Sequence, residues 1–339
     1  MMRDLTCFGE TSVQIADASS SSSSSGTGAS GRGKGKGIGG GASAARSRRR
    51  VTCLYHARLA GQPCAVSVTW TRGGGGLVGR QAAALGVVVA VGCTSGDHRL
   101  WRADVRPWLF SKRSRGSKTL DVAATAAAAG GGGAGKVDVF WDLSGARFGA
   151  GPEPLEGFYV AVVCGLEMVL LLGDMRKEAY RRTGAGRPAP DVDNALLVAR
   201  REHVVGRKVY SARAQFCHGG PCHDVVIECD IDTAVAGVVS RDPCLEIRVD
   251  RRPVVQVKRL PWKFRGNQII LVDGLPVKVF WDVHGWLFGS VTADAVFMFR
   301  TCQAEPEKSV TWAYSQIFRE PQLQGHHGFS LIIHAWKVE

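Results

Sequence analysis

The sequence predicts a mainly β protein, and three observations support this prediction. Short runs rich in Val, Ile, Phe and Trp recur from Val51 onward, separated by Gly, Asp and Pro clusters. Many runs alternate apolar and polar residues with the period of a strand, as LEIRVD does at 245–250. Helical patterns are scarce. We therefore expect duplicated antiparallel β units, sandwich-like or barrel-like, that pack together with few short helices.

The composition is that of a globular chain. Of the 339 residues, 45% are hydrophobic and 22% are charged, which is too apolar for a wholly disordered protein. At about 150 residues a domain, the length allows two domains. No uncharged apolar run reaches the roughly 18 residues of a membrane-spanning helix. The nearest run, 158–172, contains Gly165 and Glu167 and predicts two strands.

An internal repeat is the strongest signal in the sequence. VDVFWDLSGARFG at 137–149 and VKVFWDVHGWLFG at 277–289 share eight of thirteen residues at a constant offset of 140. Upstream of each copy, Trp108 and Trp262 stand in matching Pro-Trp-x-Phe segments. We expect two copies of one β unit. Because Trp108 recurs in a half of the chain with balanced charge, we expect Trp262 and Trp108 to be core tryptophans.

The repeated motif predicts an interior strand followed by a turn. In Val-x-Val-Phe-Trp-Asp the valines and Trp141 point one way and Phe140 the other, so both faces are buried. Asp142 and Asp282 begin Asp-x-x-Gly, which is typical of a type I turn whose aspartate accepts a hydrogen bond from the backbone two residues on. The alternative, a pair of catalytic carboxylates, has no suitable partner group nearby in the sequence.

These patterns divide the chain into four parts. Residues 1–50 are predicted to be an N-terminal segment, mostly disordered and basic, in which 2–17 could form a strand that docks on the core. Residues 51–173 form the first β unit. A connecting segment with a short helix, 174–223, leads to the second β unit at 224–339.

One helix is expected in the connecting segment. The run DMRKEAYRRT at 174–183 has Asp174 in the N-cap position and places Arg181 and Arg182 near the C-terminal end. Residues 194–204, NALLVARREHV, are ambiguous between helix and strand.

The formal charge of +13 lies in the first 120 residues. Residues 1–50 hold eight Lys and Arg against three Asp and Glu, and residues 51–120 hold ten against two. Such clustering attracts phosphates and anionic lipids, although a solvated, solubilising face is the simpler interpretation. Aromatic residues among the cations at 102–118 suit nucleic acids. The candidate anion-binding residues are Arg176, Lys177, Arg181, Arg182, Lys112, Arg113 and Arg115.

A candidate zinc site stands between two predicted strands. The heptapeptide CHGGPCH at 217–223 holds two thiols and two imidazoles, all suitable zinc ligands. The candidate metal ligands are Cys217, His218, Cys222 and His223. The Cys-x4-Cys spacing is looser than the common Cys-x2-Cys pair, and no second pair stands at a standard distance. A polar turn between strands is the alternative, and no other cofactor is expected.

Other motifs give little support to a catalytic site. The Asp-x-Asp pairs at 191–193 and 230–232 suggest calcium but supply too few oxygens. Adjacent histidines at 326–327 point in different directions in an extended chain and are assigned to a loop. Phosphate-loop, serine-hydrolase and zincin motifs do not occur.

The cysteines and the N-terminus predict a compartment. Several of the ten cysteines lie inside strand-like runs, and the first 20 residues lack the apolar core of a secretory signal. We expect a reduced, cytoplasmic protein. RSRRR at 46–50 makes the nucleus an alternative, and a plastid transit peptide is the competing interpretation of the N-terminal segment.

Several blocks in the chain resemble a plant family known as domain of unknown function 868. They are KVDVFWDLSGARFGAGPEPLEGFYVAVV, LLLGDMRKEAYRR, ARREHVVGRKVYSARAQF, VQVKRLPWKFRGNQ and VFWDVHGWLFG. The opening MRDLTCFGE also resembles the usual start of that family, which argues against a cleaved leader. The resemblance covers nearly the whole chain and implies no activity and no ligand.

The sequence favours a non-enzymatic β-sandwich module that presents loops, or a groove between its halves, to a protein partner or a small ligand. One alternative is a binder of nucleic acid or anionic membrane that acts through residues 30–118. A second alternative is an enzyme with an unrecognised site near 217–223.

Overall fold

The computed structural model describes ten stretches of the chain, and the structural statements below concern these residues. They are 49–59, 62–72, 83–92, 98–105, 114–121, 136–186, 195–230, 243–289, 293–301 and 328–337. Nineteen strands, two α-helices and one 3-10 helix lie within them. The prediction of a mainly β protein is therefore confirmed.

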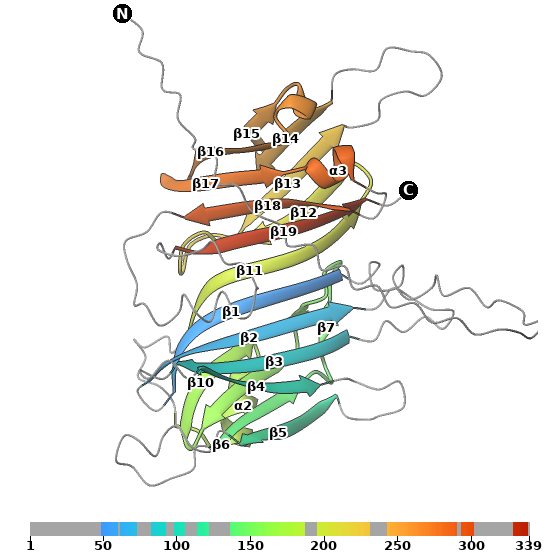
Figure 1. Cartoon of the computed structure of the whole chain (residues 1–339). Helices are drawn as coiled ribbons and strands as arrows, with labels where there is room; N and C mark the ends of the chain where they lie inside the picture. The colour runs from blue at the N-terminus through green and yellow to red at the C-terminus, as the bar shows by residue number, and fades with distance from the viewer. Residues whose placement is uncertain are drawn as a thin grey trace, which may run out of the picture. The chain divides into compact units, whose positions relative to one another are not determined.

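The strands form one nine-stranded sheet, two four-stranded sheets and a two-stranded hairpin (Figure 1). The nine-stranded sheet has the order β16 (Arg265–Val272), β17 (Leu275–Asp282), β18 (Asp294–Thr301), β19 (Ser330–Lys337), β11 (Ala195–Gly206), β1 (Arg49–Leu59), β2 (Gln62–Arg72), β3 (Ala83–Gly92) and β4 (His98–Val105). The first small sheet has the order β10 (Glu167–Gly173), β9 (Tyr159–Cys164), β6 (Lys136–Asp142) and β5 (Arg115–Asp121). The second small sheet has the order β12 (Val209–Ala214), β13 (His223–Asp230), β14 (Cys244–Val249) and β15 (Arg252–Val257). The hairpin pairs β7 (Arg147–Phe148) with β8 (Pro154–Glu156).

Strand β11 joins the two halves of the nine-stranded sheet. It pairs antiparallel with β1 along one edge and parallel with β19 along the other. The segment 194–204, ambiguous in the sequence, is thus a strand from Ala195 onward. Because both edges of β11 are hydrogen-bonded, strands from the first and the second half of the chain share one sheet.

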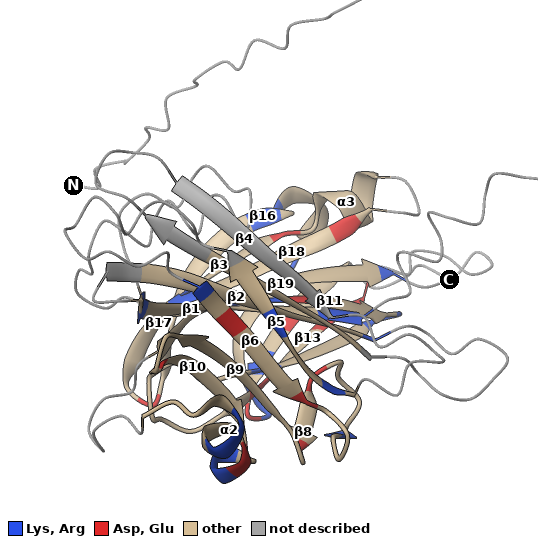
Figure 2. Cartoon of the chain, turned by 90° about the horizontal axis from the view of Figure 1, so that it is seen from below, with Lys and Arg blue, Asp and Glu red and all other residues tan. Residues whose placement is uncertain are grey.

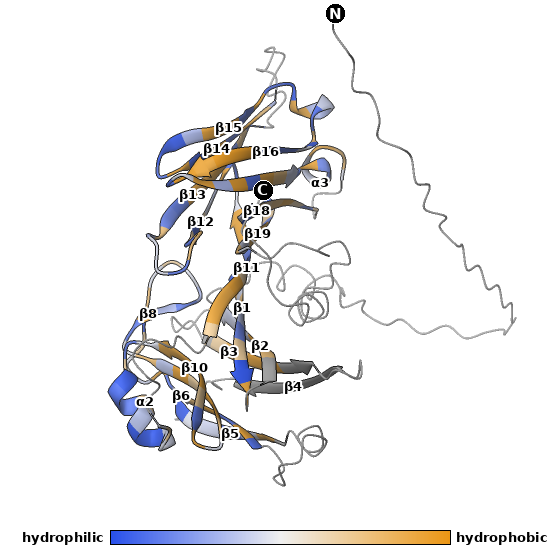
Figure 3. Ribbon diagram, turned by 90° about the vertical axis from the view of Figure 1, so that its left-hand side faces the viewer, coloured by the Kyte–Doolittle hydropathy of each residue, from blue (hydrophilic) through white to orange (hydrophobic). Residues whose placement is uncertain are grey.

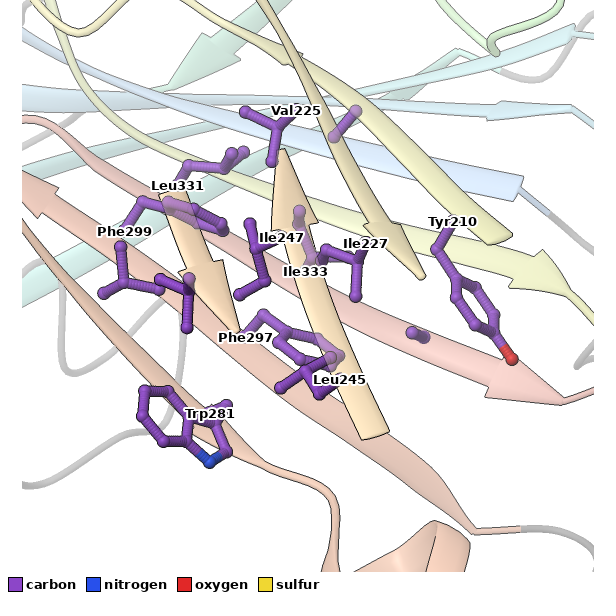
Figure 4. Close-up of a cluster of buried hydrophobic side chains, with 14 of the residues drawn as sticks. Tyr210, Val225, Ile227, Leu245, Ile247, Trp281, Phe297, Phe299, Leu331 and Ile333 are labelled. Atoms are coloured by element: carbon purple, nitrogen blue, oxygen red, sulfur yellow. The ribbon is translucent and has the colours of Figure 1, made fainter. Parts of the chain in front are cut away.

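Each small sheet packs on one half of the same face of the nine-stranded sheet (Figure 3). The first core lies between β1–β3 and the first small sheet, where Val66, Val139 and Val160 are fully buried. The second core lies between β16–β19 and the second small sheet, where Ile247 and Phe297 are fully buried (Figure 4). Fully burying one such side chain contributes about 1.5–3 kcal/mol, so the two cores are the main source of stability.

The repeated Val-x-Val-Phe-Trp-Asp motifs form interior strands, as predicted. Strand β6 lies between β5 and β9, and β17 lies between β16 and β18. In β6 the valines and Trp141 belong to the first core, whereas Phe140 packs on the opposite face of the sheet. Large side chains on both faces therefore mark strands that are covered on both sides.

The aspartates that end these strands hold turns, as expected. Asp142 Oδ1 accepts hydrogen bonds from the backbone nitrogen of Ser144 at 3.0 Å and from its hydroxyl at 2.6 Å. Asp282 Oδ1 accepts one from the backbone nitrogen of His284 at 3.0 Å. The second copy differs from the predicted isolated turn, because helix α3 (His284–Phe288) begins there.

The predicted helix exists, but its expected N-cap is wrong. Helix α2 runs from Arg176 to Thr183, and Gly184 ends it at φ 66° in the left-handed region that favours glycine. Asp174 does not cap it. Its two carboxylate oxygens accept hydrogen bonds from the backbone nitrogens of Gly157 and Phe158 at 3.0 and 3.1 Å, so the side chain fastens the start of β9 instead.

The boundaries of the predicted parts can be compared with the described elements. The connecting segment 174–223 contains α2, β11 and β12, and both strands are hydrogen-bonded into sheets. Strand β1 begins at Arg49, within the predicted segment 1–50. Residues 1–48 lie outside the described residues, as do the Asp-x-Asp pair at 191–193 and the histidines at 326–327.

A close contact between glycine and tryptophan recurs in both halves. A Cβ at Gly116 would lie 2.7 Å from Trp141 Cζ2, and a Cβ at Gly266 would overlap the ring of Trp281. Both tryptophans are more than nine-tenths buried. Neither ring has room to move away, because protein interiors are close-packed.

We expect Gly266→Ala to destabilise the protein by about 1–3 kcal/mol, the usual cost of overpacking. Urea unfolding followed by circular dichroism measures this change as a lower midpoint. Gly151→Ala is the matched control, because a Cβ at Gly151 would meet nothing within 4 Å. Equal midpoints for the two variants would contradict the packing described.

Candidate functional site

An exposed tryptophan marks the connection between the last strand of the second small sheet, β15, and the first strand of the nine-stranded sheet, β16. The connection turns through the 3-10 helix η2 (Leu260–Trp262), in which Pro261 supplies the fixed φ of a first helical turn. Arg259 precedes it at φ 55°, a left-handed conformation that is uncommon for a residue with a Cβ. Leu260 is fully buried, whereas Trp262 is 87% exposed.

The prediction that Trp262 is a core residue is wrong. The buried positions at this end of the second core are held by Leu260 and Trp281, so the turn leaves Trp262 in solvent. Trp108, on which the prediction rested, lies outside the described residues. An exposed tryptophan leaves a large apolar surface in water, and such residues commonly anchor binding interfaces.

The tryptophan borders a hollow that two cations also line. The hollow has a volume of about 440 Å³ and is lined by Pro243, Arg259, Pro261, Trp262 and Lys263. Lys258, Arg259 and Lys263 are all exposed, and none of them forms an ion pair in the described part of the chain. We call Pro243 together with residues 258–263 the Trp262 corner.

Aromatic contacts support the corner from the side of β16. Phe264 packs edge-on against His284 and Phe288, with ring centroids 5.4 and 5.6 Å away. Arg265 lies over the Phe264 ring at 5.5 Å and binds Asp282 Oδ2 at 2.8 Å. Such contacts contribute about 0.5–1.5 kcal/mol each and hold the segment after Trp262 in place.

A signal for this corner was present in the sequence. The run KRLPWKFR places four cations around Trp262 in a part of the chain whose overall charge is balanced. The total charge of residues 121–339 hides this cluster, because acidic residues elsewhere in the same range balance its cations. The exposure itself could not be read, because alternation does not tell which side of a short turn faces the core.

The zinc candidates lie at one end of the second small sheet. The turn from 215 to 222 is closed by hydrogen bonds from the Gly220 backbone nitrogen to the Cys217 carbonyl at 3.2 Å and from Gln215 to the Gly220 carbonyl at 2.7 Å. Cys222 and His218 are exposed, whereas His223 is 5% exposed. Within the described ranges no three His, Cys, Asp or Glu side chains are placed to hold a metal ion.

His223 bridges two carboxylates. Its Nδ1 lies 2.6 Å from Asp250 Oδ2, and its Nε2 lies 3.2 Å from Asp273 Oδ2. These aspartates stand in the turns after β14 and β16, so the imidazole ties the second small sheet to the nine-stranded sheet. A neutral imidazole donates one hydrogen bond, whereas an imidazolium donates two. A zinc ion bound by His223 would displace one of these carboxylates, and zinc binding by this loop stays a prediction.

The bridge to His223 favours the ionised form of the Asp250 carboxyl. Its hydrogen bond from His223, followed by one from the Asp224 backbone nitrogen, lowers the pKa of the Asp250 carboxyl. A lowered pKa in the folded state stabilises the fold above the pKa of the unfolded chain, about 3.9, and this contribution is lost as the pH falls through the folded value.

We therefore expect Asp250→Asn to lower the stability at pH 7, and the deficit to shrink below about pH 4. Because the side chain is 50% exposed, solvent screening limits the loss to about 1 kcal/mol or less. Unfolding midpoints measured from pH 3 to pH 8 test this. Asp230→Asn, which removes half of the exposed Lys208–Asp230 pair, is the control. A deficit that grows in acid would contradict the assignment.

Five of the seven predicted anion-binding residues lie on the first small sheet or on the helix that covers it. Helix α2, largely blue in Figure 2, packs through Ala179 on the outer face of this sheet. Arg176, Lys177, Arg181 and Arg182 are exposed. Arg115 stands on β5 of the same sheet. Its charge lies close enough to α2 to help lower the pKa of Glu178, a shift whose main cause is Arg181.

Ion pairs reduce the positive charge of this surface. Arg181 binds Glu178 through two hydrogen bonds of 2.6 and 2.8 Å, and Arg115 binds the buried Asp142 at 2.6 Å. In the described part of the chain Arg176 and Lys177 have no ion-pair partner. Lys112 and Arg113 lie outside the described residues. Anion binding here stays a prediction.

A buried polar cluster lies where the two cores meet. Arg200 on β11 binds Glu202 on the same strand and Glu153 in the β7–β8 loop, each at 2.5 Å. The Cys53 thiol lies 3.5 Å from both Glu153 and Arg200. Burial raises the pKa of the Glu202 carboxyl, and the Arg200 charge opposes this. Sequence reasoning missed this cluster, because its members are far apart in the chain.

An Asp–His pair on the opposite face of the nine-stranded sheet also has the residue types of a catalytic site. Asp294 Oδ2 lies 2.7 Å from His334 Nδ1, and the His334 ring stacks on His203 at 4.9 Å. The His334 Nε2 is buried and has no hydrogen-bond partner. Burial lowers the pKa of His203 to about 3, with Arg50 as the next cause. No described hydroxyl or thiol contacts His334 Nε2, so the pair lacks a nucleophile.

The buried thiols are poor nucleophiles. Burial raises the pKa of Cys53, Cys64 and Cys229 to about 12 each, and the thiolate is the reactive form. The seven described cysteines are free. Cys222 is exposed.

We expect iodoacetamide at pH 7.5 to alkylate Cys222 in the native protein and to leave Cys53, Cys64 and Cys229 unmodified, because these are buried and protonated. Peptide mass spectrometry after a timed reaction measures each site. The same reaction in 6 M guanidinium chloride is the control, in which all four react. Native labelling of Cys53 at the rate of Cys222 would contradict the burial described.

Comparisons with known proteins give one family and no closer match. A model of the family described as plant protein of unknown function (DUF868) matches residues 46–337. No match was found among curated proteins or among solved structures. None of the described helices is long and apolar enough to cross a membrane.

Proposed function

Because the chain belongs to this plant family of unknown function (DUF868), which assigns no activity, we propose from the geometry that it is a non-enzymatic binding module for a protein partner, with the Trp262 corner as its binding surface. The observation that carries the proposal is the 87% exposure of Trp262 beside a hollow lined by Arg259 and Lys263, which form no ion pair within the described residues.

The polar clusters of the described chain support a module without catalysis. Arg200 binds both Glu153 and Glu202, His223 binds two aspartates, and His334 binds one. A catalytic group must face a substrate with a free polar atom. The cations and carboxylates named here tie strands and sheets together, and His334 Nε2, which has no hydrogen-bond partner among the described residues, is buried. Their geometry explains their presence without a reaction.

The residues shared by the two copies of the repeat also have structural explanations. We propose that the two halves arose by duplication of one β unit. In each half a glycine packs on the motif tryptophan, and an arginine one residue before that glycine binds the motif aspartate: Arg115 with Asp142, and Arg265 with Asp282. Strands β5, β6, β9 and β10 correspond in order to β16–β19. The shared residues thus have structural roles.

The energetics favour a partner that covers Trp262. Burying a tryptophan side chain removes roughly 150–250 Å² of surface from water and is among the most favourable single contributions to an interface. A protein keeps such a side chain exposed at a cost in solubility. The neighbouring prolines and the buried Leu260 hold the corner in shape before the partner arrives.

A second candidate function is the binding of an anionic surface by α2. Arg176 and Lys177 are exposed and without an ion-pair partner in the described residues, and Arg182 lies one turn further along. This candidate extends the sequence-based proposal that residues 30–118 attract nucleic acid or anionic lipid. Binding that weakens with salt and is lost in Arg176→Glu/Lys177→Glu would support it.

Panning a random peptide library on the full chain tests the binding module. We expect enriched peptides whose affinity falls roughly tenfold or more in Trp262→Ala, the usual loss at a tryptophan hot spot. Leu166→Ala is the matched control, because Leu166 is 74% exposed in the first half of the chain. Circular dichroism confirms that the variants fold. Failure to enrich any peptide that depends on Trp262 would overturn the proposal.

A further inference from the structure

We infer that the Trp262 corner recognises an acidic, extended peptide segment of its partner. The inference rests on the proposed binding function and adds the chemistry of the ligand. Three features of the corner carry it: cations without an ion pair among the described residues, an apolar wall, and the backbone amides of residues 260, 262 and 263, which are already hydrogen-bonded.

The charges of the corner attract anions. Arg259 and Lys263 line the hollow beside Trp262, and Lys258 precedes Arg259 in the chain. All three are exposed, and none has an ion pair among the described residues. The next cation along the chain, Arg265, is bound to Asp282 at 2.8 Å and contributes less. Cations gathered in this way repel one another, and a ligand with two or three carboxylates relieves this repulsion.

The backbone of the corner argues against a compact phosphate as the ligand. Phosphate sites are built from free backbone N–H groups at helix starts or nests. Here the Leu260 nitrogen donates to the Pro243 carbonyl at 3.1 Å, the Trp262 nitrogen to Arg259 at 3.0 Å and the Lys263 nitrogen to Leu260 at 3.0 Å. Prolines 243 and 261 have no N–H. The amides of residues 260, 262 and 263 are therefore not free to form a phosphate nest.

The apolar wall fits peptide groups that alternate with acids. Trp262 and the two prolines line the hollow, whose volume of about 440 Å³ is at the small end of ligand sites and suits a few side chains. Proline and aliphatic residues stack on tryptophan without needing hydrogen bonds. An extended segment with carboxylates on one side and such residues on the other meets both surfaces.

The shape of the corner favours a peptide over a membrane or a nucleic acid. Membrane anchoring uses a projecting apolar tip, whereas Trp262 is one wall of a hollow. Single-stranded nucleic acid stacks on successive aromatic faces along a groove. The next aromatic residue along the chain, Phe264, packs against His284 and Phe288.

A fluorescein-labelled peptide of six Glu-Pro repeats is the probe, measured by fluorescence polarisation with the full chain. We expect binding that weakens as salt rises from 50 to 300 mM, and no binding of the matching Gln-Pro peptide. Trp262→Ala should weaken binding roughly tenfold or more. Lys258→Gln and Lys263→Gln should each weaken it roughly two- to fivefold, as expected for exposed charge pairs.

The matched control is Lys136→Gln/Arg207→Gln, which removes two exposed cations that lie outside both the Trp262 corner and α2 and should leave binding unchanged. Equal binding of the Glu-Pro and Gln-Pro peptides, or equal losses in this control and in the corner variants, would overturn the inference. Competition with other anions gives a further test. Displacement of the labelled peptide by 10 mM inorganic phosphate would overturn the inference. A twelve-residue oligo-dT or phosphatidylserine vesicles that displace it at lower concentrations than the unlabelled peptide does would overturn it as well.

The two proposals fail in different ways. If library panning yields peptides that require Trp262 but carry no acidic residues, the corner is a binding surface and the acidic ligand is wrong. If no enriched peptide requires Trp262 and the Glu-Pro peptide does not bind, both are wrong. Unchanged unfolding midpoints in the corner variants exclude a loss of folding as the cause.

Discussion

Strand β11 is hydrogen-bonded to β1 along one edge and to β19 along the other, and both cores depend on this shared position. Each small sheet covers its own half of the nine-stranded sheet, so the strip along β11 needs another cover. The β7–β8 loop supplies it through Glu153, which meets Arg200. Removing one partner of a buried ion pair typically costs about 3–5 kcal/mol, so this strip is sensitive to a single change.

The three arginines around the loop show how the strip is closed. Arg49 and Arg72 donate to loop carbonyls at Ala150 and Gly149, at 3.1 and 2.6 Å, while Arg200 binds the carboxylate of Glu153. Carbonyl acceptors satisfy part of each guanidinium without adding charge. The junction between the halves is therefore polar, and its three arginines are each hydrogen-bonded to the β7–β8 loop.

Sequence patterns predicted what depends on local alternation and missed what depends on tertiary contacts. The buried faces of β6 follow from the period of a strand, and the hydrogen bond of Asp142 follows from turn chemistry. Asp174 was assigned to a cap because the rule considers its own helix, yet it binds a neighbouring strand. Trp262 was assigned to a core by likeness to Trp108, although Leu260 occupies the buried position. The Arg200 cluster has no local signature.

Two specific contacts hold the exposed corner on the second core, and they explain how the corner keeps its shape. Trp281, more than nine-tenths buried, donates its indole N–H to the Lys263 carbonyl at 3.0 Å, and Gly266 allows that ring to lie against the strand. Leu260 fixes the other side of the turn from within the second core. A surface held in this way would lose little conformational entropy on binding the proposed partner, so most of the area buried on Trp262 would contribute to affinity. The residues that the two motifs share for packing thus also hold Trp262, a tryptophan that packing leaves exposed.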